Sequence, residues 1–211
     1  MIEKIIDRIG YVYPLKEKDV DEFKTFKAAY FNNECEAYEA RNMGNIFGMY
    51  SKSFLGLFKT ERLVISPLDI DAPLFSLYIV NGKNVYFDFI DVTLDRSYSE
   101  KRTLAVKQKY QEYLQNDQKA QWYDEIRLKS SFIARFIDKK TAEECVMELF
   151  EAYLKSLDET HVCYSGDKKE KIARYVNGLL ESGSTSTDFF IKHLGKERTE
   201  RFFNEAMFSS K

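Results

Sequence analysis

Residues 74–91 read LFSLYIV, NGKN and VYFDFID, and these three pieces decide the fold. Two short runs rich in aromatic and β-branched residues flank an Asn-Gly pair, and both turn residues tolerate the positive φ that a tight turn needs. We therefore predict a β-hairpin whose turn is residues 81–84. Pairing across that turn sorts the side chains onto two faces. One face carries Ser76, Tyr78, Phe87, Phe89 and Asp91, and the other carries Phe75, Leu77, Ile79, Tyr86, Asp88 and Ile90.

Both faces of the predicted hairpin are mostly apolar. A sheet with one face in water alternates apolar with polar residues, so this sheet needs a cover on each side. The segments 45–51 and 57–66 are also short and aromatic-rich, which predicts further strands beside the hairpin. We therefore predict an α/β (α+β) fold, a three-layer α/β/α sandwich around a central, mainly antiparallel sheet.

The N-terminal part of the chain, residues 1–43, is predicted to be a helical segment. Its apolar residues recur at three- and four-residue steps, the spacing that places side chains on one helix face. They are Val20, Phe23, Phe26, Tyr30 and Phe31.

The C-terminal half predicts one more strand and several helices. The strand, at 125–137, has one basic face with Arg127, Lys129 and Arg135, which suits a sheet edge or a cleft wall. Five helices are predicted. The first spans 97–117, the second begins with a capping box at Thr141 and Glu144, and the third runs from 168 to the break at Gly183. The fourth is capped by Thr185 with Asp188, and the last follows Gly195.

Charge and cysteine content narrow the class of protein. A net charge of −2 gives no field that would attract nucleic acid or an anionic membrane. No run approaches the roughly 18 apolar residues of a membrane span, and Glu3 and Lys4 interrupt the first apolar stretch, unlike a signal peptide. Cys35, Cys145 and Cys163 are few and widely spaced, so we expect reduced thiols and a cytoplasmic protein.

Several kinds of site are not expected. The chain has no glycine-rich phosphate loop, and its two histidines, His161 and His193, are too few for a histidine metal site. On the predicted faces Asp88 and Asp91 point in opposite directions, so they do not form a general acid/base pair. The 17 Phe and 14 Tyr leave two explanations open, a core filled with rings or a cleft for a large conjugated ligand.

Two stretches carry a resemblance to a known family. Residues 194–208 read LGKERTERFFNEAMF, a glycine followed by an acidic helix with aromatic residues in its middle and a Phe end. Pro73-Leu74-Phe75 leads through Ile79-Val80 to Phe89-Ile90-Asp91. Together these resemble the closing signature and the Pro-x-Phe-Gly-x-Asp strand of ferredoxin-dependent bilin reductases, and the resemblance covers residues 44–208 of a chain that we expect to form one domain, 1–211.

The resemblance implies an α/β/α sandwich that holds a linear tetrapyrrole (a bilin) between the sheet and the C-terminal helices. It also implies that reduced ferredoxin supplies electrons one at a time, with no metal or flavin cofactor. The protein itself then holds the bilin and supplies protons to a radical intermediate.

The chain departs from the family pattern at all three of the usual proton-handling positions, and at one glycine beside them. Tyr78 stands where the family has Asp, and Ser76 stands where it has Gly. No histidine occurs around Glu61 and Arg62, and Ser182-Gly183 replaces an Asn-Asp pair. A carboxylic acid with a pKa of about 4 and a phenol with a pKa of about 10 are different proton donors, so other groups must move protons here.

Candidate roles follow from the resemblance and the predicted faces. Tyr78 is the expected proton donor, and Asp91 the group that orients it; the alternative is that Tyr78 packs in the core and Asp91 caps a strand end. The expected bilin-binding residues, some of them cations that would neutralise its two propionates, are Glu61, Arg62, Ser76, Phe87, Phe89, Arg127 and Lys129.

Three functions remain open at this point. The chain is a divergent bilin reductase, a tetrapyrrole-binding protein without turnover, or the same fold reused as a protein-interaction domain. The basic strand residues are equally consistent with exposed edge charges that have no specific role.

Overall fold

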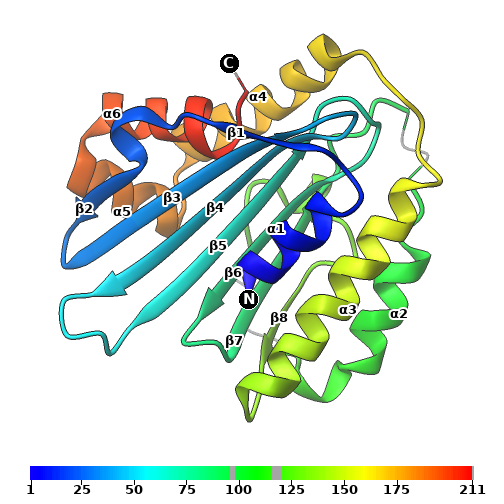
Figure 1. Cartoon of the computed structure of the whole chain (residues 1–211), viewed down its shortest axis with the longest axis horizontal. Helices are drawn as coiled ribbons and strands as arrows, with labels where there is room; N and C mark the ends of the chain where they lie inside the picture. The colour runs from blue at the N-terminus through cyan, green and yellow to red at the C-terminus, as the bar shows by residue number, and fades with distance from the viewer. Residues whose placement is uncertain (96–97, 116–119, 211) are drawn as a thin grey trace.

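The computed structural model describes residues 1–95, 98–115 and 120–210, which form one large sheet with helices on both faces (Figure 1). The sheet has eight strands in the order β1-β3-β4-β5-β6-β7-β8, with β2 also paired to β3, and every strand pair is antiparallel. The predicted three-layer sandwich with a mainly antiparallel sheet is confirmed. The strands are β1 (Leu15–Lys18), β2 (Thr25–Ala28), β3 (Phe31–Ala40), β4 (Gly44–Ser53), β5 (Lys59–Pro67), β6 (Leu74–Val80), β7 (Asn84–Ile90) and β8 (Phe132–Arg135).

The helices divide between the two faces of the sheet. One face is covered by α1 (Ile2–Gly10) and α3 (Lys139–Leu157), with α2 (Lys101–Lys109) beside α3 (Figure 1). The opposite face is covered by the C-terminal elements α4 (Ser165–Ser182), α5 (Thr185–Leu194), α6 (Lys196–Arg201) and a π-helix (Phe202–Met207). Among the described residues, no helix is both long and apolar enough to cross a membrane.

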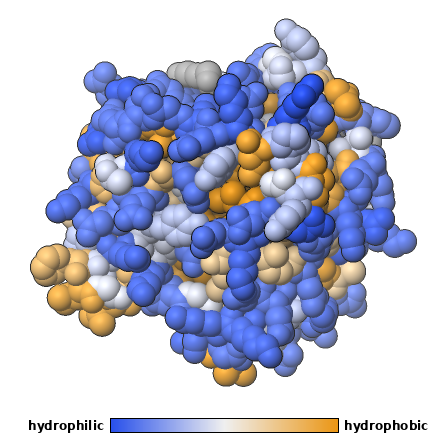
Figure 2. All heavy atoms as spheres, in the orientation of Figure 1, coloured by the Kyte–Doolittle hydropathy of each residue, from blue (hydrophilic) through white to orange (hydrophobic). Residues whose placement is uncertain are grey.

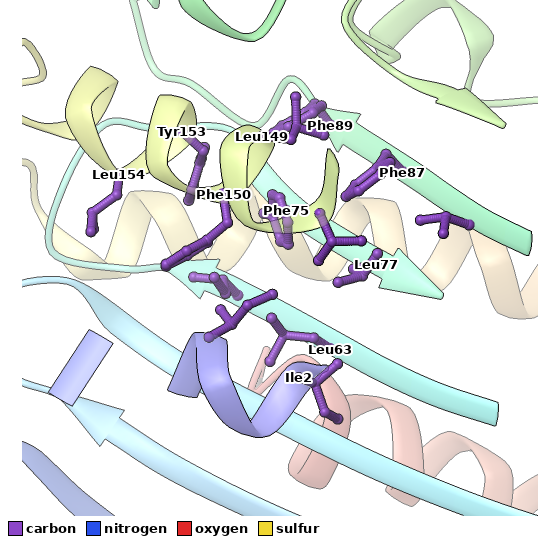
Figure 3. Close-up of a cluster of buried hydrophobic side chains, with 14 of the residues drawn as sticks. Ile2, Leu63, Phe75, Leu77, Phe87, Phe89, Leu149, Phe150, Tyr153 and Leu154 are labelled. Carbon is purple, nitrogen blue, oxygen red and sulfur yellow. The ribbon is translucent and has the colours of Figure 1, made fainter. Parts of the chain in front are cut away.

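The core beneath α1 and α3 is built largely from aromatic rings. Phe75 of β6 lies 5.3 Å from Phe89 and 5.1 Å from Tyr153 of α3, measured between ring centroids. Tyr153 is fully buried, and its hydroxyl donates a hydrogen bond to the carbonyl oxygen of Pro73 at 3.0 Å. Figure 3 shows these rings facing one another across the interface between the sheet and α3. Part of the aromatic content therefore fills a core.

The hairpin is present, but the predicted pairing of its strands is off by one residue. Val80 pairs with Asn84, Tyr78 with Tyr86 and Ser76 with Asp88. Asn81 and Gly82 both have positive φ, 52° and 70°, so the turn residues behave as predicted while the turn is one residue shorter. Because side chains alternate along a strand, that single residue moves every side chain of β7 to the other face.

The prediction that the N-terminal segment, residues 1–43, is helical is wrong beyond α1. Residues 21–23 form one 3₁₀ turn, and β2 and the start of β3 follow it. In β2, Phe26 and Ala28 are buried while Thr25 and Lys27 are exposed, which is the two-residue period of a strand. The left-handed conformation of Ala29, with φ of 52°, reverses the chain into β3. The helix of this region is α1, whose buried face carries Ile2, Ile5, Ile6 and Ile9.

Other predicted boundaries shift by a few residues. The strand expected at 125–137 begins only at Phe132, after a 3₁₀ turn at Asp124–Ile126. The helix expected at 97–117 is shorter, Lys101–Lys109, and the ends of that prediction (97, 116 and 117) lie outside the described residues. The caps of α3 and α5 are Asp138 and Ser184, whose side chains accept hydrogen bonds from the backbone N–H groups of Thr141 and Thr187.

A buried ion pair ties α4 to the sheet. The Lys168 ammonium is fully buried and lies 3.0 Å from the Asp71 carboxylate in the β5–β6 connection. It also donates to the carbonyl oxygens of Ala72 at 2.7 Å and Val92 at 2.8 Å, so all three of its donors are used. Asp71 in turn accepts a hydrogen bond from the backbone N–H of Leu94 at 2.7 Å. Burial lowers the pKa of Lys168, and the Asp71 carboxylate opposes that shift.

Replacing Lys168 with methionine is expected to lower the free energy of unfolding by about 3–5 kcal/mol, because it leaves the buried Asp71 charge without its partner. Urea denaturation followed by circular dichroism measures the change. The matched control is Lys169→Met at the adjacent exposed position, where the change is expected to stay below about 0.5 kcal/mol. Equal losses for the two variants would contradict a structural role for the pair.

Candidate functional site

A cleft of about 650 Å³ lies between the sheet and the C-terminal helices. Its floor is the sheet face that carries Ser76 and Tyr78, with contributions from β3 through β8. Its opposite wall consists of residues from α4, α5 and the π-helix, and Gln121, Tyr123 and Arg127 close one side. The cleft thus lies between one face of the sheet and the helices that cover it.

The charged groups of the cleft come from three segments. The Arg127 guanidinium, which follows the 3₁₀ turn, forms an ion pair with the Asp88 carboxylate of β7, and it lies 3.6 Å from the carboxylate of Asp124. The Arg62 guanidinium of β5 donates from Nη2 to the hydroxyl of Ser186 at 2.9 Å and lies 4.7 Å from the centre of the Tyr78 ring. The cleft therefore contains two cations and one carboxylate, with Arg62 and Asp88 on the floor and Arg127 at its side.

Burial shifts the proton affinities of these groups. It raises the pKa of Asp88, and the Arg127 guanidinium opposes that shift. It also lowers the pKa of Arg62, although a guanidinium stays charged under all ordinary conditions. Asp88 is the one Asp or Glu among the described residues that line the cleft. The site therefore contains a carboxyl group that holds its proton more strongly than an exposed aspartate does.

Aromatic rings form the walls around these charges. Tyr78 and Tyr86 lie 5.6 Å apart on the floor, and Tyr123 and Tyr175 lie 5.6 Å apart on the side, measured between ring centroids. Phe208, after the π-helix, lies 5.9 Å from Tyr175. Burial raises the pKa of Tyr123 to about 12, so its phenol stays protonated at neutral pH. Such a wall suits the flat face of a conjugated ligand while its hydroxyl groups remain hydrogen-bond donors.

The start of α5 is fixed to the sheet. Gly183 has φ of 72°, a conformation that glycine adopts without strain, and this turns the chain from α4 into α5. Ser184 then caps α5, and Ser186 accepts the hydrogen bond from Arg62. Both serines line the cleft. The N-terminal turn of α5 is thus held over the floor by a side chain of the site itself.

Four of the residues expected to bind or act on a ligand come together in this cleft. Arg62, Ser76, Tyr78 and Arg127 all line it. Their placement agrees with the geometry that the sequence implied, and their roles stay predictions.

Five other expected residues are not brought into the cleft. The corrected register turns Phe87 and Phe89 to the opposite face, where both are fully buried in the core under α3. Glu61 also faces that side and accepts hydrogen bonds from the backbone nitrogens of the first two residues, at 2.6 and 3.0 Å. Asp91 accepts a hydrogen bond from the backbone N–H of Thr93 at 3.1 Å, and Lys129 is exposed; neither lines the cleft.

The sequence reasoning missed several residues of the cleft, among them three that matter most for its chemistry. Asp88, like Tyr86, was assigned to the wrong face, whereas Tyr123 and Tyr175 were not singled out. The signal that would have placed Asp88 is the length of the hairpin turn, which the sequence Asn-Gly-Lys-Asn leaves ambiguous by one residue. The tyrosines come from a loop and a helix far apart in the chain, and only the packing of α4 brings them together.

The Asp88 carboxyl is expected to titrate above about 3.9, the ordinary pKa of an aspartate, because burial disfavours its charged form. Carbon-13 NMR of protein labelled at aspartate measures this value, with Asp88→Asn to assign the signal. Removing the opposing cation in Arg127→Gln is expected to raise the pKa further, whereas the exposed control Arg135→Gln leaves it unchanged. A pKa at or below the ordinary value, or a lower one in Arg127→Gln, would contradict this.

No family model matches the chain, and no curated protein sequence matches it. A solved structure does: phytochromobilin synthase from tomato in complex with biliverdin, at a TM-score of 0.77 and 12% sequence identity. The match covers 99% of this chain and 82% of the tomato chain. At this identity the likeness concerns the fold. The chain therefore has the fold of a protein whose structure contains a bound bilin.

Proposed function

We propose that this protein binds a linear tetrapyrrole in the cleft and reduces it with electrons from a ferredoxin-type donor. The observation that carries the proposal is the position of the cleft. It lies between the sheet face with Ser76 and Tyr78 and the C-terminal helices, where the sequence resemblance places a bilin. The fold shared with a biliverdin-bound protein supports the same ligand class.

The chemistry of the cleft suits such a ligand. Its volume of about 650 Å³ falls within the range of roughly 300–1,000 Å³ that small-molecule sites occupy. A bilin is a flat conjugated chain with two propionates, so it needs aromatic walls and cations. Tyr78, Tyr86 and Tyr175 supply rings, and Arg62 and Arg127 supply charge. The buried Nε of Arg62 has no hydrogen-bond partner in the described part of the structure, which leaves a donor for a carboxylate.

Asp88 is the proton donor that we propose for the reduction. Reducing one double bond takes two electrons, which a ferredoxin supplies singly, and two protons. Asp88 faces the cleft, and burial raises its pKa, so it keeps a proton up to a higher pH than an exposed aspartate does. Tyr78, on the neighbouring strand, is the proposed second donor. Asp91 has no part in this proposal, because its carboxylate lies outside the cleft and is engaged by Thr93.

A non-catalytic tetrapyrrole-binding protein is the second candidate. The observation that favours it is the substitution of the proton-handling positions of the family, with Tyr78 in place of Asp and Ser182-Gly183 in place of Asn-Asp. The two candidates share the ligand and differ in turnover. An open cleft counts against the third reading, a protein-interaction domain in which the cavity is filled.

Mixing the purified protein with biliverdin is expected to shift the visible absorption of the pigment as it enters the cleft. Arg62→Gln is expected to weaken the Kd by about tenfold to a hundredfold, the value of one charge-assisted hydrogen bond. Arg102→Gln, an exposed position on α2, is the matched control and leaves the Kd unchanged. Unshifted spectra with several bilins would contradict both the reductase and the non-catalytic binding protein.

Under anaerobic conditions with reduced ferredoxin, the bound bilin is expected to lose absorption at its original wavelength as a reduced product forms. Asp88→Asn is expected to slow this step by about 10²–10⁴-fold, the usual worth of a general acid, with the Kd changed only a few-fold. Chromatography of the pigment identifies the product. Binding without any product would assign the chain to the non-catalytic candidate, and an undiminished rate in Asp88→Asn would remove Asp88 from the mechanism.

A further inference from the structure

Four connections meet at one end of the sheet. Because β2 to β8 run antiparallel, the turns β2–β3, β4–β5 and β6–β7 and the passage from β8 to α3 all lie at the same end (Figure 1). We call residues 27–31, 52–59, 80–84 and 135–140 the turn end. All of them belong to the described part of the chain.

The turn end exposes large apolar side chains. The β4–β5 hairpin contributes four of them in five residues, and the neighbouring segments contribute two more. Figure 2 shows apolar side chains gathered at the lower-left corner of the molecule, where this hairpin projects in Figure 1. The exposed fractions run from 52% to 84% for Tyr30, Phe54, Leu55, Leu57, Phe58 and Ile137.

This exposure results from an ordered turn. Within the hairpin, the backbone N–H of Ser53 donates to the carbonyl oxygen of Phe58 at 2.9 Å, and Gly56 has φ of 66°. The backbone N–H of Phe54 donates to the carbonyl oxygen of Tyr30 at 3.0 Å, which joins the two neighbouring turns. These hydrogen bonds order the β4–β5 turn, residues 54–58, in a conformation that projects its apolar side chains away from the sheet.

The turn end is also strongly basic. It contains seven basic residues and one acidic residue, Asp138, in a chain whose net charge is −2. Asp138 is already engaged as the cap of α3. All seven cations are exposed: Lys27, Lys52, Lys59, Lys83, Arg135, Lys139 and Lys140.

From this combination we infer that the turn end docks on a lipid bilayer that contains anionic lipids. Phe54, Leu55, Leu57 and Phe58 insert at the level of the headgroups, and the surrounding lysines contact lipid phosphates. Apolar side chains on one side and Lys-rich surroundings are the pattern of segments that lie in a membrane interface. Each basic residue near an anionic surface strengthens binding by about fivefold, and the turn end has seven.

A bilayer fits better than a protein partner. Six of the seven cations are lysine, and lysine is depleted in protein–protein interfaces, where arginine is preferred. A lysine beside a membrane lays its methylene stem along apolar surface while its ammonium stays in water. The apolar groups also project as a knob, which a fluid bilayer accepts without a matching pocket.

The turn end adjoins one end of the cleft. Phe31, the first residue of β3, lines the cleft, and its ring lies 4.6 Å from that of Tyr30, measured between centroids. Ser51 and Thr60, which flank the β4–β5 hairpin, line the cleft as well. Docking would therefore hold this end of the cleft against the bilayer, whatever ligand the cleft takes.

Sedimentation of the full chain with vesicles tests the inference. Vesicles of phosphatidylcholine mixed with phosphatidylserine are expected to bind the protein at least tenfold more tightly than phosphatidylcholine alone, and added salt is expected to weaken binding. Phe54→Ser combined with Phe58→Ser is expected to reduce binding by more than tenfold, as is Lys52→Glu combined with Lys59→Glu. Circular dichroism confirms that each variant is folded.

The matched control changes exposed apolar residues elsewhere. Val162→Ser with Tyr164→Ser alters side chains that are 85% and 73% exposed in the α3–α4 connection, and binding is expected to stay as in the unchanged protein. Failure to bind phosphatidylserine vesicles would overturn the inference. So would an equal loss of vesicle binding in the control and in the variant with Phe54→Ser and Phe58→Ser. So would vesicle-independent capture of an acidic protein by the same lysines, which would make the turn end a protein-docking site.

Discussion

The ion pair between Lys168 and Asp71 is the interaction on which the architecture of the cleft depends. It joins α4 to the β5–β6 connection, and the same ammonium reaches the chain just beyond β7 through the Val92 carbonyl. The next turns of α4 carry Tyr175 and Leu179, which line the cleft opposite the sheet. The pair therefore sets the separation between the helical wall and the floor, and a fully satisfied buried ammonium allows little variation in it.

The layers of the fold could be predicted from the sequence, but the face of the sheet on which each side chain of β7 lies could not. The strands β4 to β7 and the helices α3 to α5 were predicted close to their observed bounds, because each is a strongly periodic segment between turn residues. Asp88 was predicted on the wrong face of the sheet because Asn81–Asn84 is compatible with turns of two lengths. One residue in that turn decides whether the floor carries Phe87 and Phe89 or Tyr86 and Asp88.

Two further features were hidden from the sequence for different reasons. Phe23 and Phe26 have helical spacing, yet they lie in a 3₁₀ turn and a strand, where both pack against Phe202 at 5.1 and 5.3 Å between ring centroids. That contact spans most of the chain, and no local pattern contains it. The basic turn end was hidden because net charge is a sum, and a sum of −2 says nothing about how charges are distributed over the surface.

The π-helix at Phe202–Met207 makes the number of residues in the C-terminal segment matter more than their identity. Its wider winding brings the backbone N–H of Phe208 to the carbonyl oxygen of Phe203, at 2.9 Å. Deleting one residue would restore α-helical winding and rotate the residues that follow by about 100° around the axis. Phe208 would then leave its position beside Tyr175. In related chains that keep this cleft, we expect substitutions between Gly195 and Phe208 to be far more frequent than insertions or deletions.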